Sequence, residues 1–223
     1  MKIVLTRELG KNDALWTWLP DHATVQEVPL TSTRYFDERA VNDDLHASEH
    51  YGKFCSLVVT SERSMTYVPL AIDASSADVE VYCVGPTTSE ALRAQGVKVR
   101  AQGDGGAATL ANQISRGPVL LIGAESMRDE LTLTLRANGL DVTVVACYET
   151  LALELDEADV AKIGDADVVF IGAPSAWSVA RDFVNADSVV VVPGASTGAV
   201  VQIDHAKIIE GWGPTLRTRL DTA

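Results

Sequence analysis

Small hydroxyl-bearing residues and glycines recur directly after the apolar runs of this sequence. They are Thr6-Arg7, Thr60-Ser61, Gly85-Pro86-Thr87-Thr88, Gly123-Ala124-Glu125-Ser126, Pro174-Ser175 and Gly194-Ala195-Ser196-Thr197. Any one of them alone is ordinary helix capping, because Ser and Thr are favoured N-cap residues. Several such ends facing one cleft would instead form anion sites, since free N–H groups and the helix dipole attract negative charge. The pattern predicts a cleft that binds several carboxylates or phosphates, with Arg7, Arg63 and Arg128 adding positive charge.

A second motif has the spacing of a hydrolase nucleophile. Gly194–Gly198 reads GASTG, which fits G-x-S-x-G and lies between an apolar run and a helical segment, as a nucleophile elbow requires. The acid and the base of a triad would have to follow it, and only Asp204 and His205 do. Two adjacent residues of one segment are poorly placed to supply both the base and its orienting carboxylate. A glycine-rich turn is the better interpretation.

A third motif has the spacing of a zinc site. His46–His50 reads HASEH, the H-x-x-E-H arrangement of one metallopeptidase group, and on a helix its two histidines would share a face. The surrounding segment is almost wholly polar and contains no recognisable third ligand, so a solvated helix face is favoured over a metal site. His22 and His205 have loop-like surroundings and are given no role.

The sequence offers no cradle for a nucleotide cofactor. No G-x-G-x-x-G motif and no P-loop follows an apolar run. The glycine-rich GDGGAA at 103–108 lacks the required spacing and is interpreted as an ordinary loop. Paired carboxylates in apolar surroundings, which mark general acid–base pairs, are also absent from the sequence. We therefore expect neither a dinucleotide nor a nucleoside triphosphate as cofactor.

Short runs rich in valine and isoleucine alternate with helical segments along the chain. The runs are KIVLTR, SLVVTS, VEVYCVG, VKVRA, PVLLIGA, DVTVVACYE, ADVVFIGA and SVVVVPG. Helices are expected over residues 11–19, 63–72, 88–95, 107–114 and 126–138, the last being the longest and ending before Gly139 as a C-cap. Continuous apolar strands that alternate with helices indicate a parallel sheet covered on both faces. The fold class predicted is α/β.

Two extended stretches, Thr24–Phe36 and Val142–Leu155, are about twice as long as a usual strand. Each is interpreted as a strand that leaves one sheet and continues into another. Residues 33–149 would then form an inserted lobe, and residues 1–32 would combine with 150–223. A weak internal echo, such as SLVVTSERS with ADVVFIGAPSA, suggests that the two lobes are similar. A cleft between them would face the carboxyl ends of both sheets, where open α/β sheets bind ligands.

Composition limits the function classes. The 223 residues include 18 Lys and Arg against 31 Asp and Glu, a net charge of −13, and 47% are hydrophobic. The apolar content excludes disorder, and the acidity argues against general affinity for nucleic acid or anionic membrane. Acidic runs such as Asp37–Asp44 are assigned to outer helix faces, so the net charge does not exclude an anionic ligand. Three scattered cysteines and no apolar run of membrane length lead us to expect a cytoplasmic protein with free thiols.

An ordered set of segments resembles uroporphyrinogen-III synthase over nearly the whole chain. The segments are VLTR, VVTSERS, CVGPTTSEALRAQG, RDELTLTLRANG, CYET, FIGAPSAW and PGAST. The resemblance implies two α/β lobes of flavodoxin-like or Rossmann-like topology, joined by a two-stranded linker. It also implies a cofactor-independent lyase of tetrapyrrole biosynthesis, which cyclises hydroxymethylbilane to uroporphyrinogen III with loss of water and inversion of the last ring.

The resemblance also implies roles for individual residues. Tyr148 of CYET matches the cleft tyrosine credited with assisting departure of the hydroxyl group. The residues matching hydroxyls that line the family's cleft are Thr60, Ser61, Thr88, Ser175 and Thr197. Ala173 stands where relatives often carry a hydroxyl, and PGAST replaces a more usual G-P-T-T. We expect a monomer whose partner is a linear polycarboxylate tetrapyrrole; the alternative is a two-lobed module that binds a small anion without chemistry.

Overall fold

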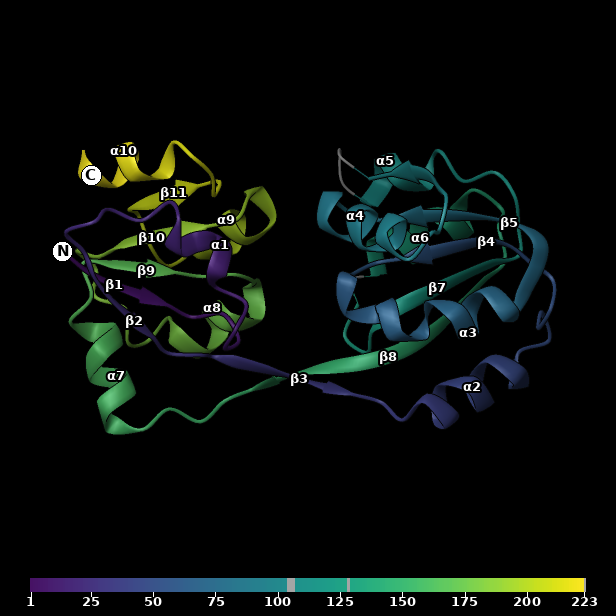
Figure 1. The fold of residues 1–223 in the computed structure, drawn as a ribbon, viewed down its shortest axis with the longest axis horizontal. Coiled ribbons are helices and arrows are strands. Elements are labelled where there is room, and N and C mark those ends of the chain that lie inside the picture. The colour runs from purple at the N-terminus through teal and green to yellow at the C-terminus, as the bar shows by residue number, and fades with distance from the viewer. Residues whose placement is uncertain (104–106, 128, 223) are drawn as a thin grey trace. The chain divides into compact units, whose positions relative to one another are not determined.

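The computed structural model describes residues 1–103, 107–127 and 129–222. The chain divides into two compact units, the first formed by Met1–Thr33 with Leu151–Ala223 and the second by Arg34–Thr150 (Figure 1). Each unit has its own sheet. The predicted α/β class is confirmed, because neighbouring strands are mainly parallel and helices separate them in the chain.

The sheet of the first unit is parallel throughout. Its strands are β1 (Lys2–Leu5), β2 (Thr24–Glu27), β9 (Val168–Phe170), β10 (Val189–Val192) and β11 (Ile208–Glu210). They lie in the order β11-β10-β9-β1-β2. Numbered within the unit, this is the flavodoxin-like order 2-1-3-4-5, whose direction reverses between β1 and β9. All five carboxyl ends meet at one edge of the sheet.

Side-chain alternation along these strands covers both faces of the sheet. Val4 belongs to an apolar cluster with Trp177 and Val201, whereas Ile3 and Leu5 belong to a second cluster. The helices are α1 (Asp13–Trp16), α7 (Glu157–Gly164), α8 (Pro174–Ala180), α9 (Ala195–Val201) and α10 (Leu216–Asp221). The first cluster lies under α7, α8 and α9 and the second under α1 and α10. This is the layering that a parallel sheet requires.

The second unit has a different strand order. Its strands are β3 (Thr31–Tyr35), β4 (Phe54–Val59), β5 (Ser75–Cys83), β6 (Val99–Gln102), β7 (Val119–Ala124) and β8 (Val142–Ala152). They lie in the order β3-β8-β7-β4-β5-β6. Without the edge strand β3, this is the Rossmann-like order 3-2-1-4-5, and its direction reverses between β4 and β7. The two units therefore share a layered architecture but not a strand order.

Helices again cover both faces of this sheet. They are α2 (Glu38–Ala47), the 3₁₀ helix η1 (Glu62–Tyr67), α3 (Val68–Asp73), α4 (Pro86–Ala94), α5 (Ala107–Ala111) and α6 (Asp129–Ala137). One apolar cluster contains residues of α2, η1, α3 and α4, and the other contains residues of α5 and α6.

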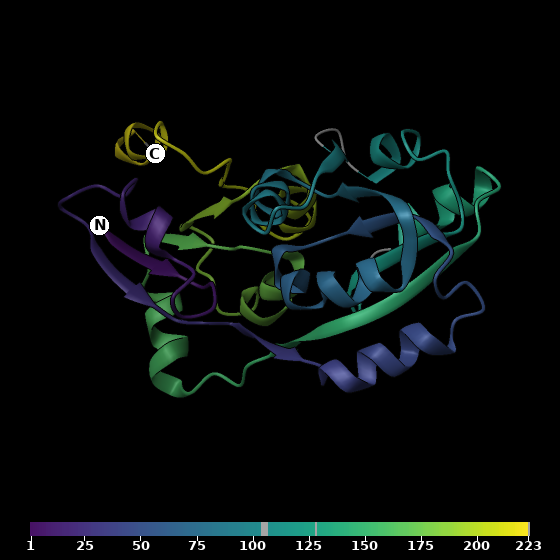
Figure 2. The same cartoon turned by 45° about the vertical axis from the view of Figure 1, so that its right-hand side comes forward.

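Strands β3 and β8 connect the two units. The Phe36 amide donates to the Cys147 carbonyl at 3.0 Å and the Leu153 amide to the Leu30 carbonyl at 2.9 Å. One residue number rises as the other falls, so the two strands are antiparallel. β8 continues for 11 residues without interruption (Figure 2). The expected stretch Thr24–Phe36 is instead two strands, because Pro29 between them has no N–H to donate.

Several helices differ from the expectation. The helix expected over 63–72 divides into η1 and α3, because Pro69 cannot donate the hydrogen bond that would continue it. Within the described ranges, the segment expected to be longest is helical over the 9 residues Asp129–Ala137, and α2 has 10 residues. Residue 128 of the expected helix lies outside these ranges. Its end agrees with the prediction, since Gly139 has φ 80°. Among the described residues, no helix is long and apolar enough to cross a membrane.

Candidate active site

The carboxyl edge of the first sheet gathers the expected small residues of that unit. The register aligns Leu5 with Phe170 and Phe170 with Val191, so Thr6 and the starts of α8 and α9 lie along one edge. Thr6 is buried, and its hydroxyl donates to the Phe170 carbonyl, which joins β1 to β9. Ser175 and Ser196 are exposed in the first turns of α8 and α9, whereas Thr197 is buried. The exposed pair is thus better placed than Thr6 to meet a ligand.

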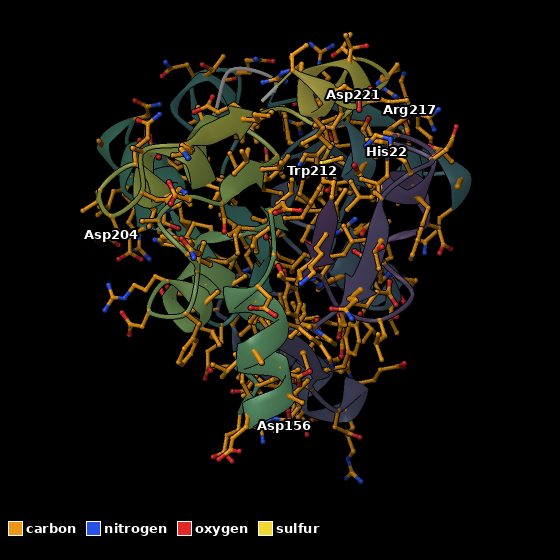
Figure 3. The ribbon with its side chains drawn as sticks, turned by 90° about the vertical axis from the view of Figure 1, so that its left-hand side faces the viewer. His22, Asp156, Asp204, Trp212, Arg217 and Asp221 are labelled. Carbon is orange, nitrogen blue, oxygen red and sulfur yellow. The ribbon has the colours of Figure 1, made fainter. Side chains whose placement is uncertain are left out.

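Arg7 lies at the point where the strand order of this sheet reverses. Its stem crosses Gly172, the residue after Ile171 on the neighbouring chain segment. Its guanidinium carbon lies 5.4 Å from the centre of the Trp212 ring, and Nη1 donates to the Lys11 carbonyl at 2.5 Å. Trp212, labelled in Figure 3, follows β11 and was missed by the sequence analysis. The only signal was its position directly after an apolar run, within Gly-Trp-Gly.

One further feature of this edge concerns the start of α9. A β-carbon on Gly198 would overlap the carboxylate of Glu210 at the end of β11. An acidic group of the chain itself therefore lies beside the turn where the sequence predicts an anion site. This acid was also missed, because in the sequence it is only a Glu at the end of an apolar run.

Tyr148 of the second unit lies in β8 and is 4% exposed. The guanidinium carbon of Arg63 is 6.0 Å from the centre of its ring, and the Tyr35 ring is 6.2 Å away at 52°. Ser61 is the N-cap of η1 and accepts a hydrogen bond from the Arg63 amide at 3.3 Å. The expected residues Ser61, Arg63 and Tyr148 are thus brought together.

Thr60 marks the point where the strand order of the second sheet reverses. Its hydroxyl lies 3.1 Å from the Ile122 carbonyl oxygen and 3.4 Å from Met127 Sδ. A β-carbon on Gly123 would overlap both Thr60 Oγ1 and Met127 Sδ. Each sheet thus has a glycine where its strand order reverses, and a side chain from the end of the neighbouring strand lies over it: Arg7 over Gly172 and Thr60 over Gly123.

The start of α4 contributes the other expected residues. Gly85 is its N-cap and has φ 80°, a conformation that a side chain would strain. Thr87 is exposed in the first turn, whereas Thr88 is buried. Arg128 and residues 104–106 of the glycine-rich loop lie outside the described residues.

A cavity of about 370 Å³ lies close to the cluster of Ser61, Arg63 and Tyr148, because Tyr35 borders both. It is lined by Tyr35, Phe36, Asp37, Glu38, Thr66 and Tyr67. The Tyr67 hydroxyl donates to the Phe36 carbonyl at 2.5 Å. Burial, followed by nearby ionisable groups, raises the pKa of Tyr67 above its usual value, so this phenol stays protonated. Tyr67 therefore acts as a fixed donor inside the protein.

A family model described as Uroporphyrinogen-III synthase HemD matches residues 22–201. The chain belongs to the uroporphyrinogen-III synthase family. The match includes both connecting strands and the cluster around Tyr148, and the family assignment confirms the resemblance seen in the sequence. Comparison with curated proteins gives no match.

Solved uroporphyrinogen III synthases share the fold. A mutant enzyme from Thermus thermophilus superposes with a TM-score of 0.69 at 13% identity, covering 100% of this chain and 96% of the other. The Helicobacter pylori enzyme gives 0.62 at 16% identity, covering 99% and 97%. A further Thermus thermophilus structure gives 0.52 at 16% identity, covering 94% and 92%. At these identities the structures establish the fold.

The hydrolase motif does not form a triad in this uroporphyrinogen-III synthase family member. Ser196 follows β10, at the carboxyl edge of the sheet. His205 is buried, with Nε2 2.8 Å from the carbonyl oxygen of Ser188, which precedes β10 at the opposite edge. Asp204 accepts a hydrogen bond from Trp177 Nε1 at 3.3 Å. The base and the serine therefore belong to opposite ends of the strand.

The HASEH segment is not one helical face. α2 ends at Ala47, so His50 lies in the turn beyond it. His46 Nδ1 is 2.8 Å from the Asn42 carbonyl oxygen, and His50 Nε2 is 2.6 Å from Asp141 Oδ2. The favoured interpretation, a solvated helix face, is therefore confirmed for His46 and wrong for His50. His50 and Asp141 lie at hydrogen-bond distance, closer than two ligands of one metal ion stand.

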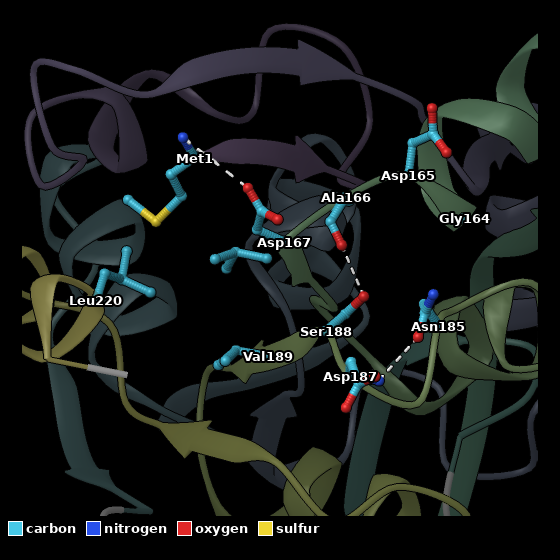
Figure 4. A pocket seen from close by; sticks show the side chains of 11 residues that line it. Met1, Gly164, Asp165, Ala166, Asp167, Asn185, Asp187, Ser188, Val189 and Leu220 are labelled. Atoms are coloured by element: carbon cyan, nitrogen blue, oxygen red, sulfur yellow. Dashed lines mark hydrogen bonds and ion pairs between the residues drawn. The ribbon is translucent and has the colours of Figure 1, made fainter.

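A cavity of about 430 Å³ in the first unit lies away from the carboxyl edge (Figure 4). It borders the amino ends of β9 and β10, and its acidic residues include Asp165, Asp167 and Asp187. The terminal amine of Met1 is 3.9 Å from Asp167, and Lys207 Nζ is 3.1 Å from Asp187. These charges are balanced within the fold, and the cavity borders none of the candidate residues.

Proposed function

We propose that this chain is a uroporphyrinogen-III synthase, which converts hydroxymethylbilane to uroporphyrinogen III with loss of water and inversion of the last ring. The observation that carries the proposal is the family match over residues 22–201. Further support comes from Tyr148, which the sequence resemblance matches to the family's cleft tyrosine and which has Arg63 beside its ring. The enzyme class is a cyclising lyase.

The chemistry requires little conventional catalytic machinery. A hydroxymethyl group on an electron-rich pyrrole leaves once its oxygen is protonated or hydrogen-bonded, because the ring stabilises the resulting azafulvene cation. Unguided closure gives the wrong isomer. The enzyme must therefore fold the chain so that the last ring attacks through its substituted carbon, forms a spiro intermediate and reopens inverted. Positioning and electrostatic stabilisation can supply most of this effect.

Tyr148 is proposed as the donor to the departing hydroxyl group. A phenol can donate a hydrogen bond without being a strong acid. The Arg63 guanidinium carbon lies 6.0 Å from the centre of its ring, and this cation–π contact holds the ring in place. Ser61 fixes the backbone from which Arg63 extends. The group thus combines a donor with a device that holds it in place.

The substrate's acetate and propionate carboxylates are proposed to bind the strand-end residues. The proposed ligands among them are Arg7, Ser61, Thr87, Ser175 and Ser196, whose side chains are exposed or half-buried. Thr6 and Thr60 instead bond to backbone carbonyls, so their proposed part is to hold the strand ends that carry neighbouring ligands. Gly85 shapes its turn, and the buried Thr88 and Thr197 lie in the first turns of α4 and α9. Arg128 is retained as a proposed ligand on sequence grounds.

The proposal includes no metal or organic cofactor, because the substrate's own pyrrole stabilises the cation. It also includes a monomer in the cytoplasm without affinity for nucleic acid or membrane. The three free cysteines and the net charge of −13 support this part.

The experiment that tests the function uses hydroxymethylbilane generated in situ and isomer analysis of the oxidised porphyrins. We expect the type III isomer in excess of the spontaneous background. The alternative, an anion-binding module without catalysis, predicts ligand uptake with only the type I isomer formed. That outcome would refute the enzyme.

A further inference from the structure

Trp212 occupies a defined place at the carboxyl edge of the first sheet (Figure 3). It is the second residue after β11, and its ring packs against the ring of buried Phe170, with centres 6.2 Å apart. Among the described residues, no acceptor is within hydrogen-bond distance of its buried Nε1. The ring is therefore held by packing and stacking rather than by its N–H group.

The contacts around Arg7 fix this side chain from several sides. A β-carbon placed on Gly172 would be 3.2 Å from Arg7 Cγ and 3.7 Å from Trp212 Cη2. The arginine stem and the indole thus fill the space that glycine leaves. The guanidinium lies over the indole ring, and Nη1 is bonded to the Lys11 carbonyl. Any larger residue at 172 would displace the stem.

The location of this group is where a doubly wound sheet binds ligands. Arg7 follows β1 and Gly172 follows β9, the two strands between which the strand order reverses. Ligands of open α/β sheets bind outside the carboxyl ends at this reversal. A cation held there meets a ligand with less loss of side-chain freedom than a mobile arginine would.

Stacking and carboxylate binding use different parts of a guanidinium. The indole contacts its face, whereas carboxylates accept hydrogen bonds from N–H groups at its edge. A guanidinium carries five N–H donors, and Nη1 of Arg7 donates to the Lys11 carbonyl. The cation–π contact with Trp212 uses none of these donors, so it orients the guanidinium without competing with its hydrogen bonds.

We propose that Trp212 is a positioning residue that presents the Arg7 guanidinium to an acetate or propionate carboxylate of the substrate. The inference rests on the proposed function, and it adds a residue that neither the sequence motifs nor the family match singles out. Gly172 is the third member of the group, because it leaves room for the arginine stem.

The test is steady-state kinetics of type III isomer formation by variants of the full chain. For Trp212→Leu we expect KM to rise about 3–10-fold with kcat within about twofold of wild type, as loss of a cation–π contact predicts. Trp212→Phe keeps an aromatic face and should restore KM to within about twofold. Arg7→Ala should raise KM at least about tenfold.

The double variant Arg7→Ala with Trp212→Leu separates positioning from a structural effect. If Trp212 acts through Arg7, the KM of the double variant equals that of Arg7→Ala alone. Arg217→Ala is the control for charge, because Arg217 forms an exposed ion pair with Asp21 and removing it changes net charge equally. Trp16→Leu, an exposed indole on α1, is the control for loss of a tryptophan.

The outcomes separate the two proposals. A wild-type protein that forms no type III isomer refutes the proposed function. An active wild type with an unchanged KM in Trp212→Leu overturns only the inference. Equal losses in Trp212→Leu and Trp212→Phe, or multiplicative effects in the double variant, also overturn it, since both indicate a purely structural indole.

Discussion

Gly123→Ala is expected to destabilise the second unit, chiefly through the contact of its added methyl group with Thr60. The added methyl group would overlap Thr60 Oγ1 and Met127 Sδ. The methionine can move away, but Thr60 is β-branched and stiff, so relief requires a new rotamer and loss of its bond to the Ile122 carbonyl. Overpacking costs ~1–3 kcal/mol and a hydrogen bond ~1 kcal/mol. We expect the free energy of unfolding to fall by about 2–4 kcal/mol.

Thr60→Ala, which removes the hydroxyl that the Gly123→Ala methyl group would overlap, is the partner variant for this test. The Ile122 carbonyl also accepts from the Thr60 amide at 3.2 Å, so losing the hydroxyl leaves no buried carbonyl unpaired. We therefore expect a cost of only about 1 kcal/mol. In the double variant the overlap with Oγ1 is gone, and its stability should lie within about 1 kcal/mol of Thr60→Ala alone.

The assay is urea unfolding followed by far-UV circular dichroism. All four tryptophans, Trp16, Trp18, Trp177 and Trp212, belong to the first unit, so indole fluorescence does not report on the second. Gly164→Ala is the control, because its nearest neighbour, the Phe183 carbonyl oxygen, would lie at an ordinary 3.5 Å. Additive losses for Gly123→Ala and Thr60→Ala would refute the reasoning, since they would show that the two residues do not meet.

Three further predictions concern single groups. Tyr148→Phe should lower kcat about 10–100-fold with KM and the circular dichroism spectrum unchanged, and full activity would remove this phenol from the mechanism. Burial raises the pKa of Cys147 to about 12, so iodoacetamide at pH 8 should modify half-buried Cys55 and spare Cys147 until urea is added, as mass spectrometry can show. Burial, together with its hydrogen bond to Glu80, raises the pKa of Tyr82 from 10.0 to about 12. The protonated phenol is favoured in the folded state, so its contribution is present below pH 10 and lost as the pH rises toward 12. Tyr82→Phe should therefore show a smaller loss of stability over that range, and identical profiles would contradict the assignment.

Periodicity predicted the fold class because the apolar runs are continuous. Strands such as Val189–Val192 have no alternation of polar and apolar residues, which is typical of a parallel sheet buried on both faces. The order of the strands could not be predicted from the sequence, because it depends on which strands pair with each other in the sheet. The difference between the flavodoxin-like first unit and the Rossmann-like second unit is therefore visible only in the structure.

Site residues with a local signal were easier to predict than those defined by packing. Ser61 and Gly85 are N-caps that the strand-to-helix pattern marks directly. The proposed role of Trp212 depends on its contact with Arg7, which is more than 200 positions away in the chain. No sequence spacing connects the two residues. His50 shows the converse, since its spacing suggested a helical pair while its partner is Asp141.

The net charge of −13 does not exclude a polycarboxylate ligand, because acids such as Asp159 and Asp187 are neutralised by ion pairs with Lys162 and Lys207. Many other acids, such as Asp21 and Asp78, form exposed ion pairs with arginines. Screening limits the reach of such charges to a Debye length of ~8 Å at physiological ionic strength.

By the proposed function, this chain directs closure of hydroxymethylbilane to the inverted isomer. The most direct measurement is the type III share of total uroporphyrin as a function of protein concentration, with substrate generated in situ at a constant rate. We expect a type III share that rises with protein concentration and approaches completion at substoichiometric amounts of protein. A share that stays at the spontaneous background at every concentration would contradict it.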